Sequence, residues 1–200
     1  MSRWYSEKKR EHFYKEAKKH GYRARSAYKL KQIQKKFNII SKNDIVIDLG
    51  AAPGGWSQVA KEIIGESGKI IGVDISPIKP INGVVFIQGD ITDKNTLEVV
   101  NKQLYNKKAD VIISDMSPDI TGNYSIDHAN SMWLCENAFN FSKIILKNGG
   151  NFICKIFEGE DTVKFINSVK NDFNMVKRFS PNASRKSSSE LYLIAKALKR

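Results

Sequence analysis

The sequence predicts an α/β fold in which a mostly parallel, doubly wound sheet of about seven strands, one of them antiparallel, carries helices on both faces. Three observations predict it. Apolar runs of strand length alternate with segments of helical periodicity, a glycine-rich turn joins the first run to the first long helix, and two strand-like runs end the chain. Parallel strands joined by crossover helices form a sheet of the Rossmann-like kind.

The predicted elements follow in order along the chain. Residues 25–37 place Leu30, Ile33 and Phe37 at helical spacing with polar residues between them, which predicts a short helix docked by one face. The expected parallel strands cover 44–50, 69–75, 84–88, 109–115 and 150–157, and the expected crossover helices lie near 55–64, 93–106, 126–147 and 160–172.

The two last strand-like runs, 174–181 and 190–198, are joined by the polar loop 182–189. A loop of this length between two strands suits a hairpin better than a crossover. We therefore expect one antiparallel strand at or near the end of the sheet.

The 200 residues, 41% of them hydrophobic, suffice for one well-buried core and are too few for two. No run approaches the roughly 20 apolar residues of a membrane span, and the N-terminus lacks the apolar core of a secretory signal. Cys135 and Cys154 form neither a CxxC pair nor a cluster with histidine, so we expect free thiols and no metal. We expect an intracellular monomer that does not bind membranes. It should be cytoplasmic if the organism is a bacterium, and mitochondrial, otherwise organellar or nucleolar if the organism is a eukaryote.

Charge is distributed unevenly along the chain. Residues 1–42 carry a net charge of +11, residues 43–163 of −6 and residues 164–200 of +7, within a formal total of +12. Basic ends of this kind favour phosphate backbones, although a solvated surface is an alternative for the first 25 residues. They lack the continuous apolar face of a membrane-surface helix, so nucleic acid is the favoured partner.

A glycine-rich turn covers residues 48–57, between the first strand and the first long helix. Glycine at such a turn lets the backbone approach a ligand closely, which indicates a nucleotide-like cofactor. The spacing, Gly50 followed by Gly54 and Gly55 with Pro53 inserted, departs from the G-x-G-x-x-G pattern of dinucleotide sites. It argues against NAD and against a nucleotide-dependent oxidoreductase.

Carboxylates stand at the ends of three successive strands, with Asp48 beside the turn, Asp74 after the second strand and Asp90 after the third. Ligands of open α/β sheets bind at these carboxyl ends, where such acids can accept ribose hydroxyls and reach an adenine amine. S-adenosylmethionine has a positive sulfonium, an amino acid head and an adenosine but no pyrophosphate. Its site should therefore be rich in acids, as this one is.

Six motifs, taken together and in this order, resemble those of the FtsJ/RrmJ family of ribose 2′-O-methyltransferases, from about Trp4 to the C-terminus. The motifs are Arg23-Ala-Arg-Ser-Ala-Tyr-Lys-Leu30, Asp48-Leu-Gly-Ala-Ala-Pro-Gly-Gly-Trp-Ser-Gln58, Gln88-Gly-Asp90, Ser114-Asp-Met-Ser-Pro118, Cys154-Lys-Ile-Phe157 and Ser184-Arg-Lys-Ser-Ser-Ser-Glu190. The resemblance implies a Rossmann-like methyltransferase fold, with S-adenosyl-L-methionine as methyl donor and S-adenosyl-L-homocysteine as product.

The resemblance also implies a substrate and site residues. The Ala-Pro-Gly-Gly-Trp form looks like the branch that methylates a uridine of ribosomal RNA in the large subunit, with Asp119 and Tyr124 as small departures. The catalytic tetrad falls on Lys29, Asp115, Lys155 and Glu190. The cofactor contacts fall on Gly54, Trp56, Asp74, Asp90 and Asp115, to which the turn adds Asp48, Gly50, Pro53 and Gly55. The resemblance further implies two parts of the chain: residues 1–42 form a basic segment with an RNA-contacting helix, and this segment packs on a methyltransferase domain, residues 43–200.

The chemistry suits these residues. A lysine with its ordinary pKa of ~10.4 is protonated at neutral pH and accepts a proton only when it is desolvated or beside another cation. Lys155 interrupts an apolar strand, and the resemblance places Lys29 nearby. We therefore expect Lys155 to receive or orient the hydroxyl proton and Asp115 to lie between the sulfonium and the lysines, while Lys29 and Glu190 tune the charge and hold the ribose.

Three alternatives remain. The same chemistry could act on a tRNA anticodon loop or on an mRNA cap, although a cap enzyme would need a further pocket that nothing in the sequence announces. A non-catalytic RNA-binding factor for ribosome assembly should lack a tetrad member, and all four are present.

Trp4 and Tyr22 could stack on RNA bases, with simple packing as the alternative.

Overall fold

Seven strands and five named helices make up the structure, a computed structural model that describes residues 12–184 and 189–199. The strands are β1 (Ile45–Leu49), β2 (Lys69–Asp74), β3 (Val84–Gln88), β4 (Ala109–Ser114), β5 (Leu146–Phe157), β6 (Phe173–Phe179) and β7 (Glu190–Leu198). The helices are α2 (Ala27–Phe37), α3 (Gly55–Ile64), α4 (Lys94–Leu104), α5 (Tyr124–Ile145) and α6 (Thr162–Asp172). Residues 12–19 are also helical.

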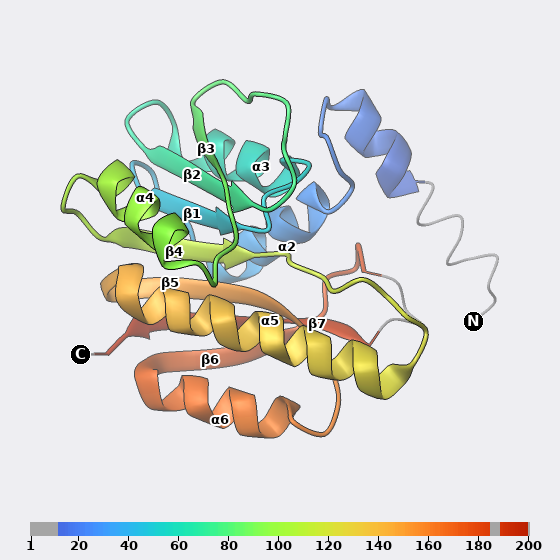
Figure 1. The fold of residues 1–200 in the computed structure, drawn as a ribbon. Helices are drawn as coiled ribbons and strands as arrows, with labels where there is room; N and C mark the ends of the chain where they lie inside the picture. Colours follow the sequence, from blue (N-terminus) through green and yellow to red (C-terminus); the bar gives the residue numbers. More distant parts are fainter. Residues whose placement is uncertain (1–11, 185–188, 200) are drawn as a thin grey trace.

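The strands form one sheet in the order β3-β2-β1-β4-β5-β7-β6 (Figure 1). Neighbours from β3 to β5 are parallel, whereas β7 is antiparallel to both β5 and β6. This confirms the predicted mostly parallel sheet with a single antiparallel strand next to its edge. The order reverses between β1 and β4, which is where ligands of such sheets bind.

Element boundaries differ from the prediction around α5. The helix begins at Tyr124, two residues early, because the Asn123 side chain accepts hydrogen bonds from two backbone N–H groups of its first turn, at 3.1 and 3.4 Å. Strand β5 begins at Leu146, four residues before the predicted strand, since Leu146 pairs with Ala109 at the start of β4. The predicted end of the helix at residue 147 is therefore wrong by two residues.

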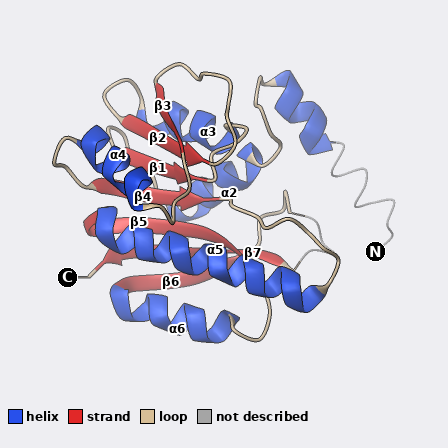
Figure 2. Cartoon of the chain, viewed as in Figure 1, coloured by secondary structure: helices blue, strands red, loops and turns tan. Residues whose placement is uncertain are grey.

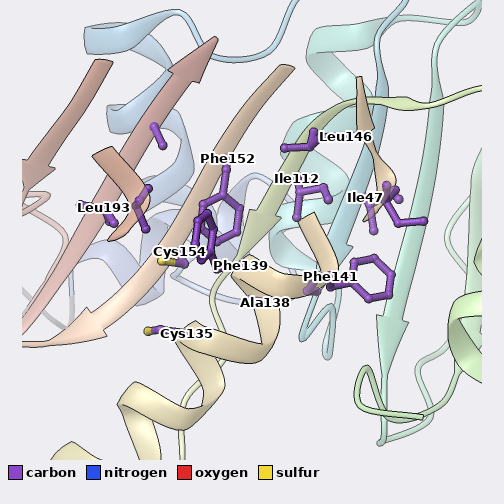
Figure 3. Packing of buried hydrophobic residues seen from close by; sticks show 14 of the residues in the cluster. Ile47, Ile112, Cys135, Ala138, Phe139, Phe141, Leu146, Phe152, Cys154 and Leu193 are labelled. Carbon is purple, nitrogen blue, oxygen red and sulfur yellow. The ribbon is translucent and has the colours of Figure 1, made fainter. Parts of the chain in front are cut away.

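Helices α4, α5 and α6 cover one face of the sheet, and α2 and α3 cover the other (Figure 2). Side chains alternate along each strand, so Ile47 and Leu49 of β1 join the first core and Val46 joins the second. Figure 3 shows the first core, where the ring centroids of Phe139 on α5 and Phe152 on β5 lie 6.0 Å apart. Burial on both faces explains the continuous apolar runs that predicted these strands.

The described part of the basic N-terminal segment packs against α3. The Tyr22 hydroxyl donates to the Glu62 carboxylate at 2.6 Å, and the backbone N–H of Arg23 donates to the Gln58 side chain at 2.9 Å. Tyr22 thus makes packing contacts and its stacking on RNA stays a prediction, while Trp4 lies outside the described residues. None of the helices described here combines the length and the apolar composition needed to cross a bilayer.

Candidate active site

Four charged side chains meet on the sheet face that α2 covers, at the carboxyl ends of β4 and β5. Lys29 Nζ of α2 lies 2.6 Å from Glu190 Oε1, and Lys155 Nζ of β5 lies 3.2 Å from Asp115 Oδ1. Only 7% of Lys29 and 8% of Lys155 is exposed, so both charges are buried. The structure brings the four residues of the predicted tetrad together as two adjacent ion pairs.

Strand register explains why these side chains share a face. Lys155 pairs directly with Tyr192 across β5 and β7, and Glu190 lies two residues before Tyr192, on the same side of β7. Asp115 follows the last residue of β4, which pairs with the residue before Lys155. Because α2 packs on this face, Lys29 reaches Glu190 from above the sheet.

Tyr192 joins the two ion pairs, and the sequence analysis missed it. Its hydroxyl donates to Asp115 Oδ1 at 2.6 Å and lies 3.4 Å from Glu190 Oε1. Burial, and then the negative charges of Asp115 and Glu190, raise the pKa of Tyr192 well above its ordinary value, so the hydroxyl keeps its proton. The available signal was a polar-tipped aromatic residue two positions after Glu190, within the apolar run 191–195.

Three charges of the cluster have a further hydrogen-bond partner, which for Asp115 is the Tyr192 hydroxyl. Lys155 Nζ also donates to the main-chain oxygen of Asp115, and the Ser184 hydroxyl donates to Glu190 Oε1 at 2.8 Å. Buried charges are tolerated when they are paired and hydrogen-bonded, and removal of one partner is strongly destabilising. The cluster is therefore held rigidly before any substrate arrives.

A cavity of about 440 Å³ opens beside Asp115 at the carboxyl ends of the parallel strands. Its lining residues are Gly50, Ala52, Val73, Asp74, Ile75, Ser76, Gly89, Asp90, Ile91, Asp115, Met116, Ser117, Asp119, Trp133 and Leu134. Four aspartates and no lysine or arginine line it, between apolar and aromatic walls. This donor set fits a cationic nucleoside such as S-adenosylmethionine and disfavours a pyrophosphate, because the carboxylates would repel its negative charge.

Two of the predicted cofactor contacts are oriented at this cavity by backbone N–H groups. Asp74 accepts hydrogen bonds from the N–H groups of Ala52 and Ser76, both at 2.8 Å, so it ties the end of β2 to the glycine-rich turn. Asp90 accepts from the backbone and the hydroxyl of Thr92, at 2.8 and 2.7 Å. Across the described residues, no group of three or more His, Cys, Asp or Glu side chains is placed to hold a metal ion.

Five predicted cofactor contacts do not line this cavity: Asp48, Pro53, Gly54, Gly55 and Trp56. Trp56 is only 3% exposed, its ring stacks on Tyr192 with centroids 5.6 Å apart, and its Nε1 donates to the main-chain oxygen of Ser26 at 2.9 Å. Trp56 thus packs on the tyrosine that joins the two ion pairs. Direct contact of these five residues with the cofactor stays a prediction.

Asp48 faces the protein interior between β1 and α3. One carboxylate oxygen accepts a hydrogen bond from the Ser57 hydroxyl at 2.6 Å, and the other has no hydrogen-bond partner among the described residues. Burial, the largest cause, raises the pKa of Asp48 to about 7. Asp48 therefore belongs to the support of the turn.

Two glycines of the turn are required by neighbouring protein segments. Gly50 and Gly54 have φ angles of +72° and +112°. A β-carbon at Gly50 would lie 2.3 Å from Met116 Cγ, and one at Gly54 would lie 2.4 Å from Ile81 Cδ1. Protein segments thus lie close to both glycines, and the approach of a ligand to them stays a prediction.

A second cavity of about 440 Å³ lies on the other side of the charged cluster. It is lined by Arg25, Lys29, Ser117, Ile120, Tyr124, Asp127, His128, Phe157, Ser189 and Glu190. Lys29 and Glu190 thus face this cavity, Asp115 faces the acidic one, and Ser117 lines both. The cluster stands at the junction of two cavities, and the sequence analysis did not foresee the second.

Comparisons with known proteins agree with this geometry. The family model described as FtsJ-like methyltransferase matches residues 22–198. A Methanothrix thermoacetophila protein named ribosomal RNA large subunit methyltransferase E is 48% identical over 189 residues, 94% of this chain and 73% of that protein. An Archaeoglobus fulgidus protein of the same name is 46% identical over 192 residues, 96% of this chain and 98% of that protein.

Solved structures share the fold. A crystal structure of a Plasmodium falciparum protein, described as a ribosomal RNA methyltransferase, matches with a TM-score of 0.80 at 34% identity, over 88% of this chain and 98% of that one. A Thermotoga maritima protein, described as a SAM-dependent O-methyltransferase, matches with a TM-score of 0.55 at 15% identity, over 84% of this chain and 64% of that one. The second match shows the fold alone.

Proposed function

The chain belongs to the FtsJ-like methyltransferase family, and we propose that it transfers a methyl group from S-adenosylmethionine to a ribose 2′-hydroxyl of large-subunit ribosomal RNA. One observation carries the proposal: the buried cluster of Lys29, Asp115, Lys155 and Glu190 stands between an acidic cavity and a second cavity of the same size. Relatives named for activity on ribosomal RNA of the large subunit support this choice of substrate.

The acidic cavity would hold the methyl donor. S-adenosylmethionine supplies a methyl group on a positively charged sulfur atom, for which carboxylates are suitable neighbours. Asp74 would accept hydrogen bonds from the ribose hydroxyls, and Asp90 would accept one from the adenine amine. Asp115 lines this cavity and contacts Lys155, so its carboxylate connects the donor side with the lysine.

The reaction forms an oxygen–carbon bond, breaks the sulfur–carbon bond and releases the hydroxyl proton. The electron pair of the broken bond stays on sulfur and leaves S-adenosylhomocysteine. Lys155 Nζ offers three hydrogen positions, and Asp115 accepts from two of them, which leaves one to meet the ribose hydroxyl. As a neutral amine Lys155 would accept the proton, and as an ammonium it would orient the hydroxyl.

The second cavity would hold the nucleotide that is methylated. Lys29 and Glu190 line it, and Arg25 adds a positive charge on the side of the basic segment, 1–42. We further propose that this segment and the basic tail, residues 164–200, bind the phosphate backbone on either side of the acidic middle of the chain, residues 43–163. A uridine is the proposed target, and the enzyme would act as a monomer in a compartment that contains ribosomes.

The proposal is tested by offering labelled S-adenosylmethionine with large ribosomal subunits, free ribosomal RNA and tRNA, and mapping the 2′-O-methyl position. We expect label in a ribose of large-subunit ribosomal RNA. The matched control is Lys155→Ala, which should bind the cofactor without transferring label. Label in tRNA alone would overturn the ribosomal assignment, and RNA binding without any transfer would identify a non-catalytic factor.

A further inference from the structure

The lining of the second cavity includes an aromatic side chain in addition to residues of the charged cluster. Tyr124, the first residue of α5, lines this cavity together with Lys29 and Glu190, and 61% of Tyr124 is exposed. Exposed aromatic rings in a nucleic-acid-binding cavity are candidates for base stacking, because every base presents a flat π face.

The Tyr124 ring is held in place from two sides. Its hydroxyl donates a hydrogen bond to the main-chain oxygen of Glu158 at 2.9 Å, just after the end of β5. Its ring lies nearly parallel to the His128 imidazole, with 10° between the planes and 6.2 Å between the centroids. An aromatic surface that is ordered in advance loses little conformational entropy when a ligand stacks on it.

His128, behind Tyr124, is itself fixed by the turn between β5 and α6. Only 7% of His128 is exposed, its Nδ1 lies 3.2 Å from the Phe157 carbonyl oxygen, and its Nε2 accepts from the Asp161 N–H at 3.3 Å. These partners assign the ring hydrogen to Nδ1. Gly159 permits the close approach, since a β-carbon there would lie 2.5 Å from the imidazole.

The loop between Asp115 and Tyr124 is also held by side-chain contacts. Asp127 accepts hydrogen bonds from the backbone and the hydroxyl of Thr121, both at 2.8 Å, and from the Gly122 N–H at 3.2 Å. The distance between the charged cluster and the Tyr124 ring is therefore set by an ordered segment.

We propose that Tyr124 is the surface on which the base of the methylated nucleotide stacks. The inference rests on the proposed function, because it assigns the base of the same nucleotide whose ribose meets the cluster. A ribose and its base are covalently joined, so a base seated on Tyr124 would place its ribose in the cavity that Lys29 and Glu190 also line. Stacking is tolerant of base identity, so Tyr124 contributes affinity and placement and leaves the choice of base to other groups.

The test is a cycle of binding measurements on the full chain with saturating S-adenosylhomocysteine. Two RNA oligonucleotides are compared, one containing the mapped target nucleotide and one with an abasic ribose in its place. For Tyr124→Ala we expect about a 10-fold or larger loss of affinity for the intact RNA and less than about a 2-fold loss for the abasic RNA. Tyr124→Phe, which keeps the ring, should stay within about 3-fold of the wild type for both.

The matched control is Tyr105→Ala, which removes a 75% exposed tyrosine at the end of α4, away from both cavities. It should change neither affinity. Unchanged S-adenosylhomocysteine binding by each variant reports an intact fold. Equal losses for both RNAs, or no loss for either, would overturn the stacking role of Tyr124.

The proposed function is judged separately, by transfer of label from S-adenosylmethionine to ribosomal RNA by the wild-type enzyme. If label is transferred but Tyr124→Ala weakens the binding of both RNAs equally, only the stacking inference is wrong. Absence of transfer removes the proposed function, and the stacking assignment falls with it.

Discussion

Lys155 Nζ and Asp115 Oδ1 lie 3.2 Å apart, and both side chains are largely buried between the sheet and α2. The pair stands where the acidic cavity meets the charged cluster, so it combines the cofactor side of the site with the group that would handle the hydroxyl proton. Lys155 does not line the cofactor cavity, so a substitution of Lys155 can change methyl transfer without changing cofactor binding.

Lys155→Ala should lower kcat by at least about 100-fold, because it removes the group that receives or orients the proton. The Kd for S-adenosylmethionine should stay within about 3-fold of the wild-type value. Calorimetric titration and single-turnover transfer measure the two quantities, and Lys164→Ala on the exposed side of α6 is the control. A variant that kept most of its turnover would remove Lys155 from the mechanism.

Tyr192→Phe should lower the free energy of unfolding by about 1.5–3 kcal/mol, because Asp115 loses a hydrogen bond to a buried charge while the ring keeps its packing on Trp56. We also expect kcat to fall by about 10-fold as Asp115 becomes less well oriented. Urea unfolding and transfer rates report both effects. Tyr22→Phe loses a hydrogen bond to Glu62 that is exposed to solvent, so it should cost only about 0.2–1 kcal/mol. Equal costs for the two variants would contradict the special role of Tyr192.

Asp48 predicts a pH-dependent stability. Its pKa is raised from 3.8 to about 7 in the folded protein, so the folded state holds a proton that the unfolded state has released between those values. Stability from this group is therefore full below about pH 4 and falls as the pH rises to 7. Asp48→Asn cannot ionise, so its stability relative to the wild type should rise by about 1–4 kcal/mol between pH 4 and pH 8.

Urea unfolding at several pH values measures this difference for Asp48→Asn. Glu66→Gln, at a side chain that is 99% exposed, should show a flat difference over the same range. A flat profile for Asp48→Asn as well would mean that Asp48 is ionised and solvated in the folded protein.

Gly54→Ala should reduce stability, which urea unfolding measures. The new β-carbon would hold a φ of +112° and would displace the tip of the Ile81 side chain, 2.4 Å away, so we expect a loss of about 1–3 kcal/mol in the free energy of unfolding. Gly149→Ala shares a positive φ of +75° but meets nothing within 4 Å, so it isolates backbone strain and should cost only about 1 kcal/mol. Equal losses for the two variants would show that the approach of Ile81 is not restrictive.

The sequence predicted most of the fold because burial on both faces produces continuous apolar runs, and the crossover helices between them have a clear helical periodicity. The antiparallel β7 followed from the short loop 182–189. The prediction failed at the junction of α5 and β5, where Leu146 is apolar enough for either element and only its pairing with Ala109 decides. Element ends depend on such tertiary contacts.

The residues of the charged cluster were also predictable, since four motifs in a fixed order carry them. Tyr192 was not, because its role depends on standing opposite Lys155 in strands that are joined through α6 and β6. The purpose of Gly50 and Gly54 and the buried position of Trp56 likewise depend on segments distant in sequence.

The sequence by itself determined which chemical groups this protein possesses, namely a glycine-rich turn, acids at successive strand ends and the lysine and carboxylate motifs. Only the tertiary structure decided which of them face a cavity and which are buried as support. The physical reason is that side-chain direction alternates along a strand, so register across the sheet assigns Lys155, Tyr192 and Glu190 to one face. That register is set by the packing of both cores together.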